Sequence, residues 1–399
     1  MRWLFVALVL LTAGCATVGT AKPPAAQAGV AFDRNGERGS FADGFAEPST
    51  GRMVTADDPV RVASLSKLVV AIGVMKLVEA GKLDLDGDVS TWLGWRLRNP
   101  AFPDRPVSLR MLLSHTSSVR DHDDQYAIPL DGLVRTAIAD ATSWDAAHGP
   151  VENYFAYANM NFPIVASIVE RVTGERFDRW MRAEVLNPMA LDACYNWPTC
   201  SDEAVALAVV LTQDGQAVKD DLGGRRPTCP VSPSADGGCD LWLWRAGDNG
   251  AMFAPQGGLR ISARGLARVG RMLLNGGMLD GGRMLSPQSV DMLLTPVWRF
   301  DGHNGDTDHG FYCSFGLASQ QIPTSGAGCN DDPIGDGVVR VGHGGDAYGL
   351  RSGIWIDRAT GTGVAFFVTG LPADPPRGRS AFRAAEEATF KRTLALLAR

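Results

Sequence analysis

A long apolar segment, Leu68 to Met75, follows the stretch Val62-Ala63-Ser64-Leu65-Ser66-Lys67. Apolar residues on most sides of this segment predict a helix buried in a domain, ending near Gly81. Positions i and i+3 of a helix share a face, so the Lys67 amine is expected beside the Ser64 hydroxyl. An alcohol needs a base within reach to act as a nucleophile, and a desolvated Lys can serve as that base. Ser64 and Lys67 are therefore a candidate nucleophile and its activator; the alternative is an N-cap Ser with a solvated Lys.

Short apolar runs predict strands towards both ends of the chain and helices between them. Strands are expected near 30–32, 39–42, 338–345, 352–357 and 363–369, with a closing helix over 381–397. Helices are expected from Ser108 as N-cap, over 164–172 and from 261 to 275. This order predicts an α/β lobe built from both termini, about 29–105 and 325–399, with a mainly helical lobe inserted over about 106–324.

The first 28 residues have a different character. Met1-Arg2 and the apolar run 3–11 resemble the charged and hydrophobic regions of an export signal, and the run is too short to span a bilayer. Ala13-Gly14-Cys15 resembles a bacterial lipobox, which makes Cys15 a lipidation candidate and predicts attachment to a membrane. The alternative is cleavage after Ala28. In either case residues 16–29 are interpreted as a tether, and the mature protein is expected in the periplasm or anchored at its membrane.

Six further cysteines form three close pairs, which are Cys194 and Cys200, Cys229 and Cys239, and Cys313 and Cys329. Close pairs in an exported chain predict disulfide bonds within each pair, and none has the Cys-x-x-Cys spacing of a metal site. The Asp- and His-rich stretches 120–124 and 301–309 are interpreted as solvated loops near a cleft, so no metal or cofactor is expected.

Charge and composition narrow the class of partner. The chain of 399 residues carries 38 Lys and Arg against 44 Asp and Glu, a net charge of −6, without a basic block. Nucleic acid is therefore not an expected partner. Gly-x-Ser-x-Gly does not occur in the sequence, which argues against the nucleophile elbow of an α/β-hydrolase.

Three motifs carry a family resemblance. Ser64-x-x-Lys67, Tyr157-x-Asn159 and His343-Gly344-Gly345 occur in the order and spacing of the serine β-lactamase and penicillin-binding-protein superfamily. The chain most resembles class C β-lactamases and their esterase and D-aminopeptidase relatives over about residues 30–399, including the stretches 112–117 and 256–259. The resemblance implies a β-lactamase/transpeptidase-like α/β (α+β) fold. In that fold an antiparallel sheet is flanked by N- and C-terminal helices, and an all-α lobe is inserted.

The same resemblance assigns roles in acyl transfer. Ser64 would attack the substrate, and Tyr157 could act as general base if a cationic Lys67 lowers the pKa of its phenol. Asn159 would hold Lys67 in position. The backbone N–H groups of Ser64 and Asp346 would form the oxyanion hole. Gly344 and Gly345 would let a substrate lie along the strand.

One departure from the family pattern concerns substrate choice. Many relatives carry a Lys where this chain has His343, and an ordinary His is mostly neutral at pH 7. Arg351 could compensate for the missing cation, whereas the loops around Asp121 and Asp306 would add negative charge at the rim of the cleft. The expected function is an exported serine hydrolase acting on a small-molecule or peptide ester or amide, with esterase, D-amino peptidase or weak β-lactamase activity. The alternatives are a true class C β-lactamase or D,D-carboxypeptidase, and a non-catalytic penicillin-binding-like receptor.

Overall fold

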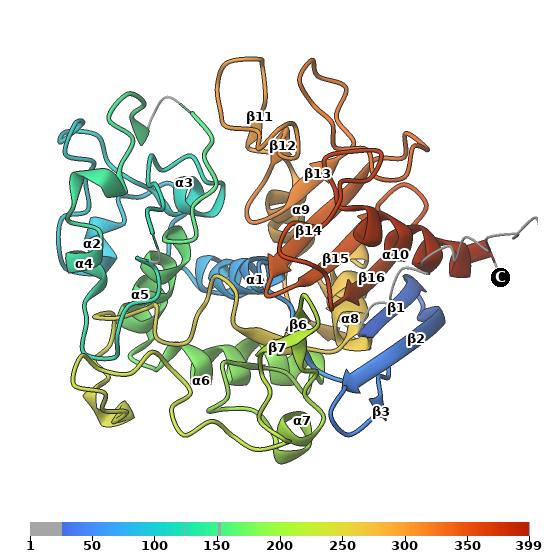
Figure 1. Ribbon diagram of the computed structural model, residues 1–399. Coiled ribbons are helices and arrows are strands. Elements are labelled where there is room, and N and C mark those ends of the chain that lie inside the picture. Colours follow the sequence, from blue (N-terminus) through green and yellow to red (C-terminus); the bar gives the residue numbers. More distant parts are fainter. Residues whose placement is uncertain (1–25, 124, 151–152, 399) are drawn as a thin grey trace, which may run out of the picture.

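The computed structural model describes residues 26–123, 125–150 and 153–398 (Figure 1). Its centre is a nine-stranded sheet in which every neighbouring pair is antiparallel. In sheet order the strands are β11 (Trp298–Arg299), β12 (Ser314–Phe315), β13 (Gln320–Ile322), β14 (Arg340–Ala347), β15 (Leu350–Asp357), β16 (Thr362–Val368), β1 (Ala26–Asp33), β2 (Glu37–Glu47) and β3 (Arg52–Met53). Because β1 pairs with β16, strands from the two ends of the chain form the middle of one sheet.

Helices cover both faces of this sheet, and others build a separate lobe (Figure 1). The helices are α1 (Leu65–Glu79), α2 (Ser90–Leu93), α3 (Leu109–Leu113), α4 (Val134–Ala137), α5 (Asn161–Thr173), α6 (Phe177–Met181), α7 (Asp202–Ala206), α8 (Ala263–Leu274), α9 (Pro287–Leu294) and α10 (Ala384–Leu394). Shorter helical turns are η1 (Ala141–Ser143), η3 (Arg182–Leu186), η4 (Asn187–Met189), η5 (Leu241–Leu243) and η6 (Ala395–Ala398). Small sheets are formed by β4 (Val60–Arg61), β8 (Leu259–Ile261) and β5 (Cys194–Tyr195), by β6 (Leu211–Gln213) and β7 (Gln216–Lys219), and by β9 (Met278–Leu279) and β10 (Gly282–Arg283).

The alternation of side chains along the central strands explains the layers. Successive side chains of a strand point to opposite faces. Phe32 belongs to the large core shared with α1 and α8, whereas its neighbour Ala31 belongs to the smaller core shared with Phe390 of α10. Helix α1 lies in the large core between the sheet and the helical lobe, and it is buried on nearly every side. Its apolar sequence therefore fixes a rigid central element at which the two lobes meet.

The predicted elements are confirmed at these positions, with two corrections. The sequence pattern predicted that the C-terminal part of the α/β lobe starts near residue 325. Strands β11, β12 and β13 also join the central sheet, so residues 298–322 belong to this lobe as well. Residues 26–29, which were expected in the tether, lie in β1. Gly29 in this strand has no room for a side chain: a Cβ there would lie 2.3 Å from Thr393 Oγ1 and 2.6 Å from the ring of Phe41.

The predicted export signal and Cys15 lie outside the described residues, which begin at Ala26. Among the residues that are described, no helix is both long and apolar enough to cross a bilayer. The three predicted cysteine pairs are present as disulfides, with Cα–Cα distances of 5.0 Å for Cys194–Cys200, 5.6 Å for Cys229–Cys239 and 5.9 Å for Cys313–Cys329. Such bonds are typical of proteins in an oxidising compartment.

Candidate active site

Ser64 stands at the N-terminal end of α1 with its side chain free of any capping role. The residue before it, Ala63, has a φ of +50°, a left-handed conformation that is unusual for a residue with a Cβ. Strain of this kind persists where the surrounding structure holds it, and it is common at functional sites. The Ser64 hydroxyl makes no N-cap hydrogen bond, so the alternative of a capping Ser is wrong. Ser64 remains partly exposed to a cleft.

Lys67 is fully buried one turn later and has three polar neighbours. Its Nζ atom lies 2.9 Å from Ser64 Oγ, 2.8 Å from Asn159 Oδ1 and 2.7 Å from the backbone oxygen of Gln256. Burial lowers the pKa of Lys67 to about 7, although the negative charge of Asp121 opposes this shift. The expected juxtaposition of Ser64, Lys67 and Asn159 is therefore present, and the alternative of a solvated Lys67 is wrong.

Tyr157 lies between two other rings beside Lys67. Its ring stacks on His115 at a centroid distance of 4.2 Å and on Tyr312 at 4.9 Å, and Lys67 Nζ lies 5.0 Å from its centroid. Burial raises the pKa of the Tyr157 phenol, and the hydroxyl groups of Ser64 and Tyr312 only partly oppose this effect. A lowered phenol pKa was the condition for Tyr157 to act as general base, and desolvation between the stacked rings shifts this pKa in the opposite direction.

Asp121 fixes the backbone of the segment that carries Tyr157 and Asn159. The Asp121 carboxylate accepts hydrogen bonds from the backbone N–H groups of Asn159, at 2.7 Å, and Met160, at 2.9 Å. His115 Nδ1 accepts a further bond from the N–H of Ala158 at 3.1 Å. The sequence predicted that Asp121 adds negative charge at the rim of the cleft. Its carboxylate is instead bound to the backbone at the start of α5 and positions that segment.

The His343-Gly344-Gly345 segment lies inside β14 and presents a free backbone edge. Within the described residues, β13 pairs with β14 only over 340–342, so the backbone from 343 to 347 is open on that side. A Cβ at Gly345 would lie 2.3 Å from both Val62 O and Ser352 Oγ, which shows that glycine is required for β14 to approach the segment before Ser64. This close approach brings Asp346 and Ser64 to the same cleft.

The charge of this segment differs from that expected of a Lys-bearing relative. His343 is buried, and burial together with Lys67 lowers its pKa to about 3, so the imidazole is neutral at physiological pH. Arg351 does line the cleft, as suggested, but its guanidinium forms an ion pair with Asp346. The fixed cation next to Ser64 is therefore absent at position 343, and the cation at 351 is already neutralised.

Ser64, Tyr157, Asn159, Gly344, Gly345 and Asp346 line one cleft with a volume of about 330 Å³. The sequence motifs did not predict several other residues that line this cleft: Arg61, Phe311, Tyr312 and Glu386. The recurrent stretch 256–259 signalled Gln256, whereas the aromatic and acidic residues belong to no motif. No group of three or more His, Cys, Asp or Glu side chains suited to a metal occurs within the described ranges.

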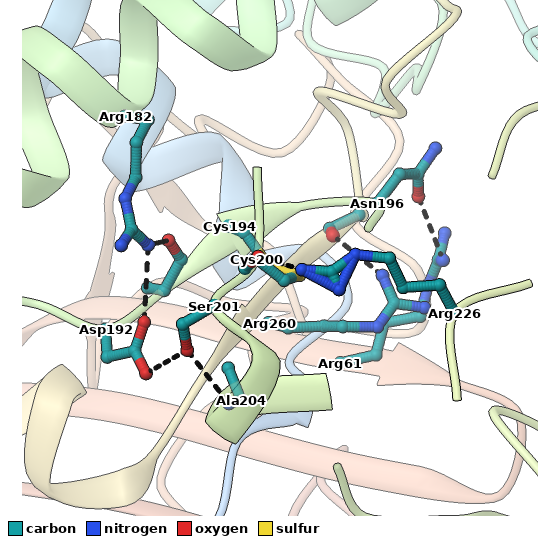
Figure 2. The surroundings of a disulfide bond; sticks show 12 residues. Arg61, Arg182, Asp192, Cys194, Asn196, Cys200, Ser201, Ala204, Arg226 and Arg260 are labelled. Carbon is teal, nitrogen blue, oxygen red and sulfur yellow. Dashed lines mark hydrogen bonds and ion pairs between the residues drawn. A yellow bond between two sulfur atoms is a disulfide. The ribbon is translucent and has the colours of Figure 1, made fainter. Parts of the chain in front are cut away.

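The Cys194–Cys200 disulfide lies beside Asn196 and Arg61 (Figure 2). Asn196, between these cysteines, accepts a hydrogen bond from Arg61 through Oδ1 at 3.3 Å. The Tyr195 hydroxyl donates to the backbone oxygen of Ser66 at 3.0 Å. Since β5 and β4 flank β8, the disulfide fixes a small sheet that leads directly into α1.

Comparison with known proteins agrees with this arrangement. A family model described as Beta-lactamase matches residues 19–389, and the chain belongs to that family. Penicillin-binding protein 4 of Amycolatopsis lactamdurans is 29% identical over 265 residues, 66% of this chain and 63% of that protein. Esterase EstB of Burkholderia gladioli is 28% identical over 171 residues, 38% of this chain and 42% of that protein. The match therefore spans less than two thirds of either relative.

The fold is shared with solved structures at lower identity. D-amino acid amidase from Ochrobactrum anthropi SV3 superposes with a TM-score of 0.65 at 18% identity, over 94% of each chain. The mixed architecture of an antiparallel sheet, flanking helices and an inserted helical lobe is therefore that of the β-lactamase/transpeptidase-like fold, as the motifs had implied.

Proposed function

We propose that this protein is a serine hydrolase that cleaves esters or amides through an acyl-enzyme on Ser64. The observation that carries the proposal is the set of partners around the Lys67 amine. Two of them, Asn159 Oδ1 and Gln256 O, can only accept hydrogen bonds, and the third is the Ser64 hydroxyl, which can donate. As an ammonium, Lys67 donates to all three of them; as a neutral amine it keeps two N–H groups for Asn159 and Gln256, and its lone pair can accept the proton of the Ser64 hydroxyl.

Catalysis then begins with proton transfer from Ser64 to neutral Lys67. The Ser64 oxygen attacks the substrate carbonyl carbon, and the carbonyl oxygen gains charge between the backbone N–H groups of Ser64 and Asp346. Tyr157 stays a protonated phenol at neutral pH because burial raises its pKa. It can therefore donate a proton to the leaving group and recover one from the Lys67 ammonium. A water repeats the cycle to release the acyl group.

The neutral His343 argues for esters and uncharged amides over β-lactams. Losing a charge-assisted contact to a substrate carboxylate costs about 1.5–3 kcal/mol, a factor of roughly ten to a hundred or more. The relatives in this family include an esterase and an amidase as well as penicillin-binding proteins. An intact set of Ser64, Lys67, Tyr157 and Asn159 argues against a non-catalytic receptor.

The proposal is tested by profiling the purified protein with a p-nitrophenyl ester, a chromogenic cephalosporin and a D-amino peptide. We expect kcat/KM for the ester to exceed that for the cephalosporin, and Ser64→Ala to abolish both. His343→Lys should raise cephalosporin turnover. A cephalosporin value at or above the ester value contradicts the proposed preference and favours a true class C β-lactamase.

We also propose that the protein is exported and anchored through a lipidated Cys15. Cleavage after Ala28 would remove residues that pair with β16 and β2, for example Gln27 with Val368, so that route damages the sheet. Cleavage before Cys15 leaves β1 intact, and the three disulfides fit an oxidising compartment. Cell fractionation should find the protein with membranes and Cys15→Ser outside them; equal distribution of the two would refute anchoring.

A further inference from the structure

The Tyr157 hydroxyl changes its charge during the proposed reaction. When Tyr157 gives its proton to the leaving group, its oxygen is a phenolate until Lys67 returns a proton. Within the part of the chain that the structure describes, the buried Tyr157 Oη atom makes no hydrogen bond of normal geometry in the resting site. A buried charge without a donor is costly, so a donor placed next to this oxygen would lower the barrier to the proton transfer.

Two hydroxyl groups, those of Ser64 and Tyr312, lie close enough to Tyr157 to lower its pKa by hydrogen bonding. Ser64 cannot donate when the leaving group departs, because its oxygen is by then bound to the acyl carbon. His343 cannot donate either: its Nδ1 atom lies 2.5 Å from Gly344 O and therefore carries the ring proton, which leaves Nε2 as an acceptor. Tyr312 keeps its proton, because burial raises the pKa of its phenol well above the usual value. The Tyr312 hydroxyl is therefore a donor at the moment when Tyr157 needs one.

Tyr312 is held against Tyr157 by a segment outside the motifs. The two rings are nearly parallel, with a centroid distance of 4.9 Å and an angle of 11°, and both side chains line the cleft. The next residue, Cys313, is bonded to Cys329. Phe311 packs edge-on against the Tyr312 ring at a centroid distance of 4.7 Å. A donor fixed by packing needs little reorganisation when charge develops beside it, and catalytic hydrogen bonds often tighten only when substrate is bound.

We propose that Tyr312 is a positioning residue that donates a hydrogen bond to Tyr157 Oη while Tyr157 protonates the leaving group. The bond between the acyl carbon and the leaving-group atom breaks, and the proton of Tyr157 moves to that atom. The Lys67 ammonium then returns a proton to Tyr157, and Tyr312 keeps its own proton throughout. This inference rests on the proposed acyl-enzyme function and adds a preference within it. The site is suited to alkyl esters and amides, whose leaving groups need a proton before they depart.

The test compares butyrate esters that differ only in the leaving group: p-nitrophenyl, phenyl and ethyl butyrate. p-Nitrophenolate departs without a proton, whereas ethoxide needs one, so the ethyl ester depends most on the proton from Tyr157. Tyr312→Phe keeps the ring and removes the hydroxyl. It should lower kcat/KM for the ethyl ester by about tenfold to a hundredfold relative to the p-nitrophenyl ester, with the phenyl ester between them. Tyr348→Phe, the same change at another tyrosine of the cleft, should leave these ratios unchanged.

Each outcome separates the role of Tyr312 from the function on which it rests. A purely structural role predicts equal losses for the three esters in Tyr312→Phe. Equal losses, or no loss, overturn the inference, while Ser64-dependent turnover of the p-nitrophenyl ester still supports the hydrolase. No turnover of any ester, or turnover that persists in Ser64→Ala, overturns the proposed function and the inference together.

A second replacement covers the case in which Tyr312→Phe fails to fold by thermal unfolding. Incorporating 3-fluorotyrosine at position 312 changes the shape little, and fluorine makes the phenol a stronger hydrogen-bond donor. The ratio of kcat/KM for the ethyl ester to that for the p-nitrophenyl ester should then rise above the wild-type ratio. An unchanged or lower ratio overturns the role of Tyr312.

Discussion

The protonation state of Lys67 should control the pH dependence of hydrolysis. A general base acts only when deprotonated, and burial lowers the pKa of this amine to about 7. About a tenth of the lysine is then neutral at pH 6 and about nine tenths at pH 8. We therefore expect kcat/KM for an uncharged ester to rise about tenfold between pH 6 and pH 8. With an ordinary lysine pKa near 10.4, activity would instead keep rising well above pH 8.

Other groups near Ser64 can be separated from Lys67 in this assay. His343, with a pKa of about 3, and His115, whose pKa burial lowers well below its usual value, stay neutral across the window. Glu386 has a pKa of about 7 and is the competing titration. We expect Glu386→Gln to keep the rise and Lys67→Arg to lose activity at every pH, because Arg stays protonated. A flat profile, a midpoint below about pH 5, or loss of the rise in Glu386→Gln would refute the assignment.

Two further predictions concern the strand and the tyrosine. Gly345→Ala forces a Cβ to within 2.3 Å of Val62 O and should lower the free energy of unfolding by about 1–3 kcal/mol. Gly344→Ala is the control: its Cβ would lie no nearer than 3.8 Å to any atom outside the adjacent residues, so its melting temperature should equal that of the wild type. Equal melting of the two variants would show that the approach of β14 is not tight. Lys67→Ala and Tyr157→Phe should each cost orders of magnitude in kcat and their combination little more, because groups that act as a unit are not additive. Multiplicative losses would assign them independent roles.

The sequence pattern predicted the elements that interactions between residues close in the sequence determine. The Ser64–Lys67 contact follows from helical spacing, and the apolar run around Ile72 predicted the burial of α1. Strands of two or three residues, such as β11 and β12, are too short to show a period, so the sequence pattern does not predict that residues 298–322 belong to the sheet. The small residues around Gly29 are typical of linkers, and only the packing of Thr393 and Phe41 explains them as strand.

Properties set by distant segments could not be predicted from the motifs. The pKa of Tyr157 depends on stacking by His115 and Tyr312, which come from separate loops. The acidic and aromatic wall of the cleft depends on α10 and on the segment stapled by the Cys313–Cys329 disulfide. No spacing of residues along the sequence predicts either the stacking on Tyr157 or the wall of the cleft, because tertiary packing alone brings these residues together.

The central claim, a covalent acyl-enzyme on Ser64, is tested most directly by intact-mass analysis after treatment with a fluorophosphonate. The wild type should gain the mass of one phosphonyl group, and peptide mapping should place it on Ser64. Ser49→Ala, at an exposed serine outside the cleft, should gain the same mass. Ser64→Ala, shown by thermal unfolding to be folded, should gain none. An adduct of equal yield in Ser64→Ala would contradict the account.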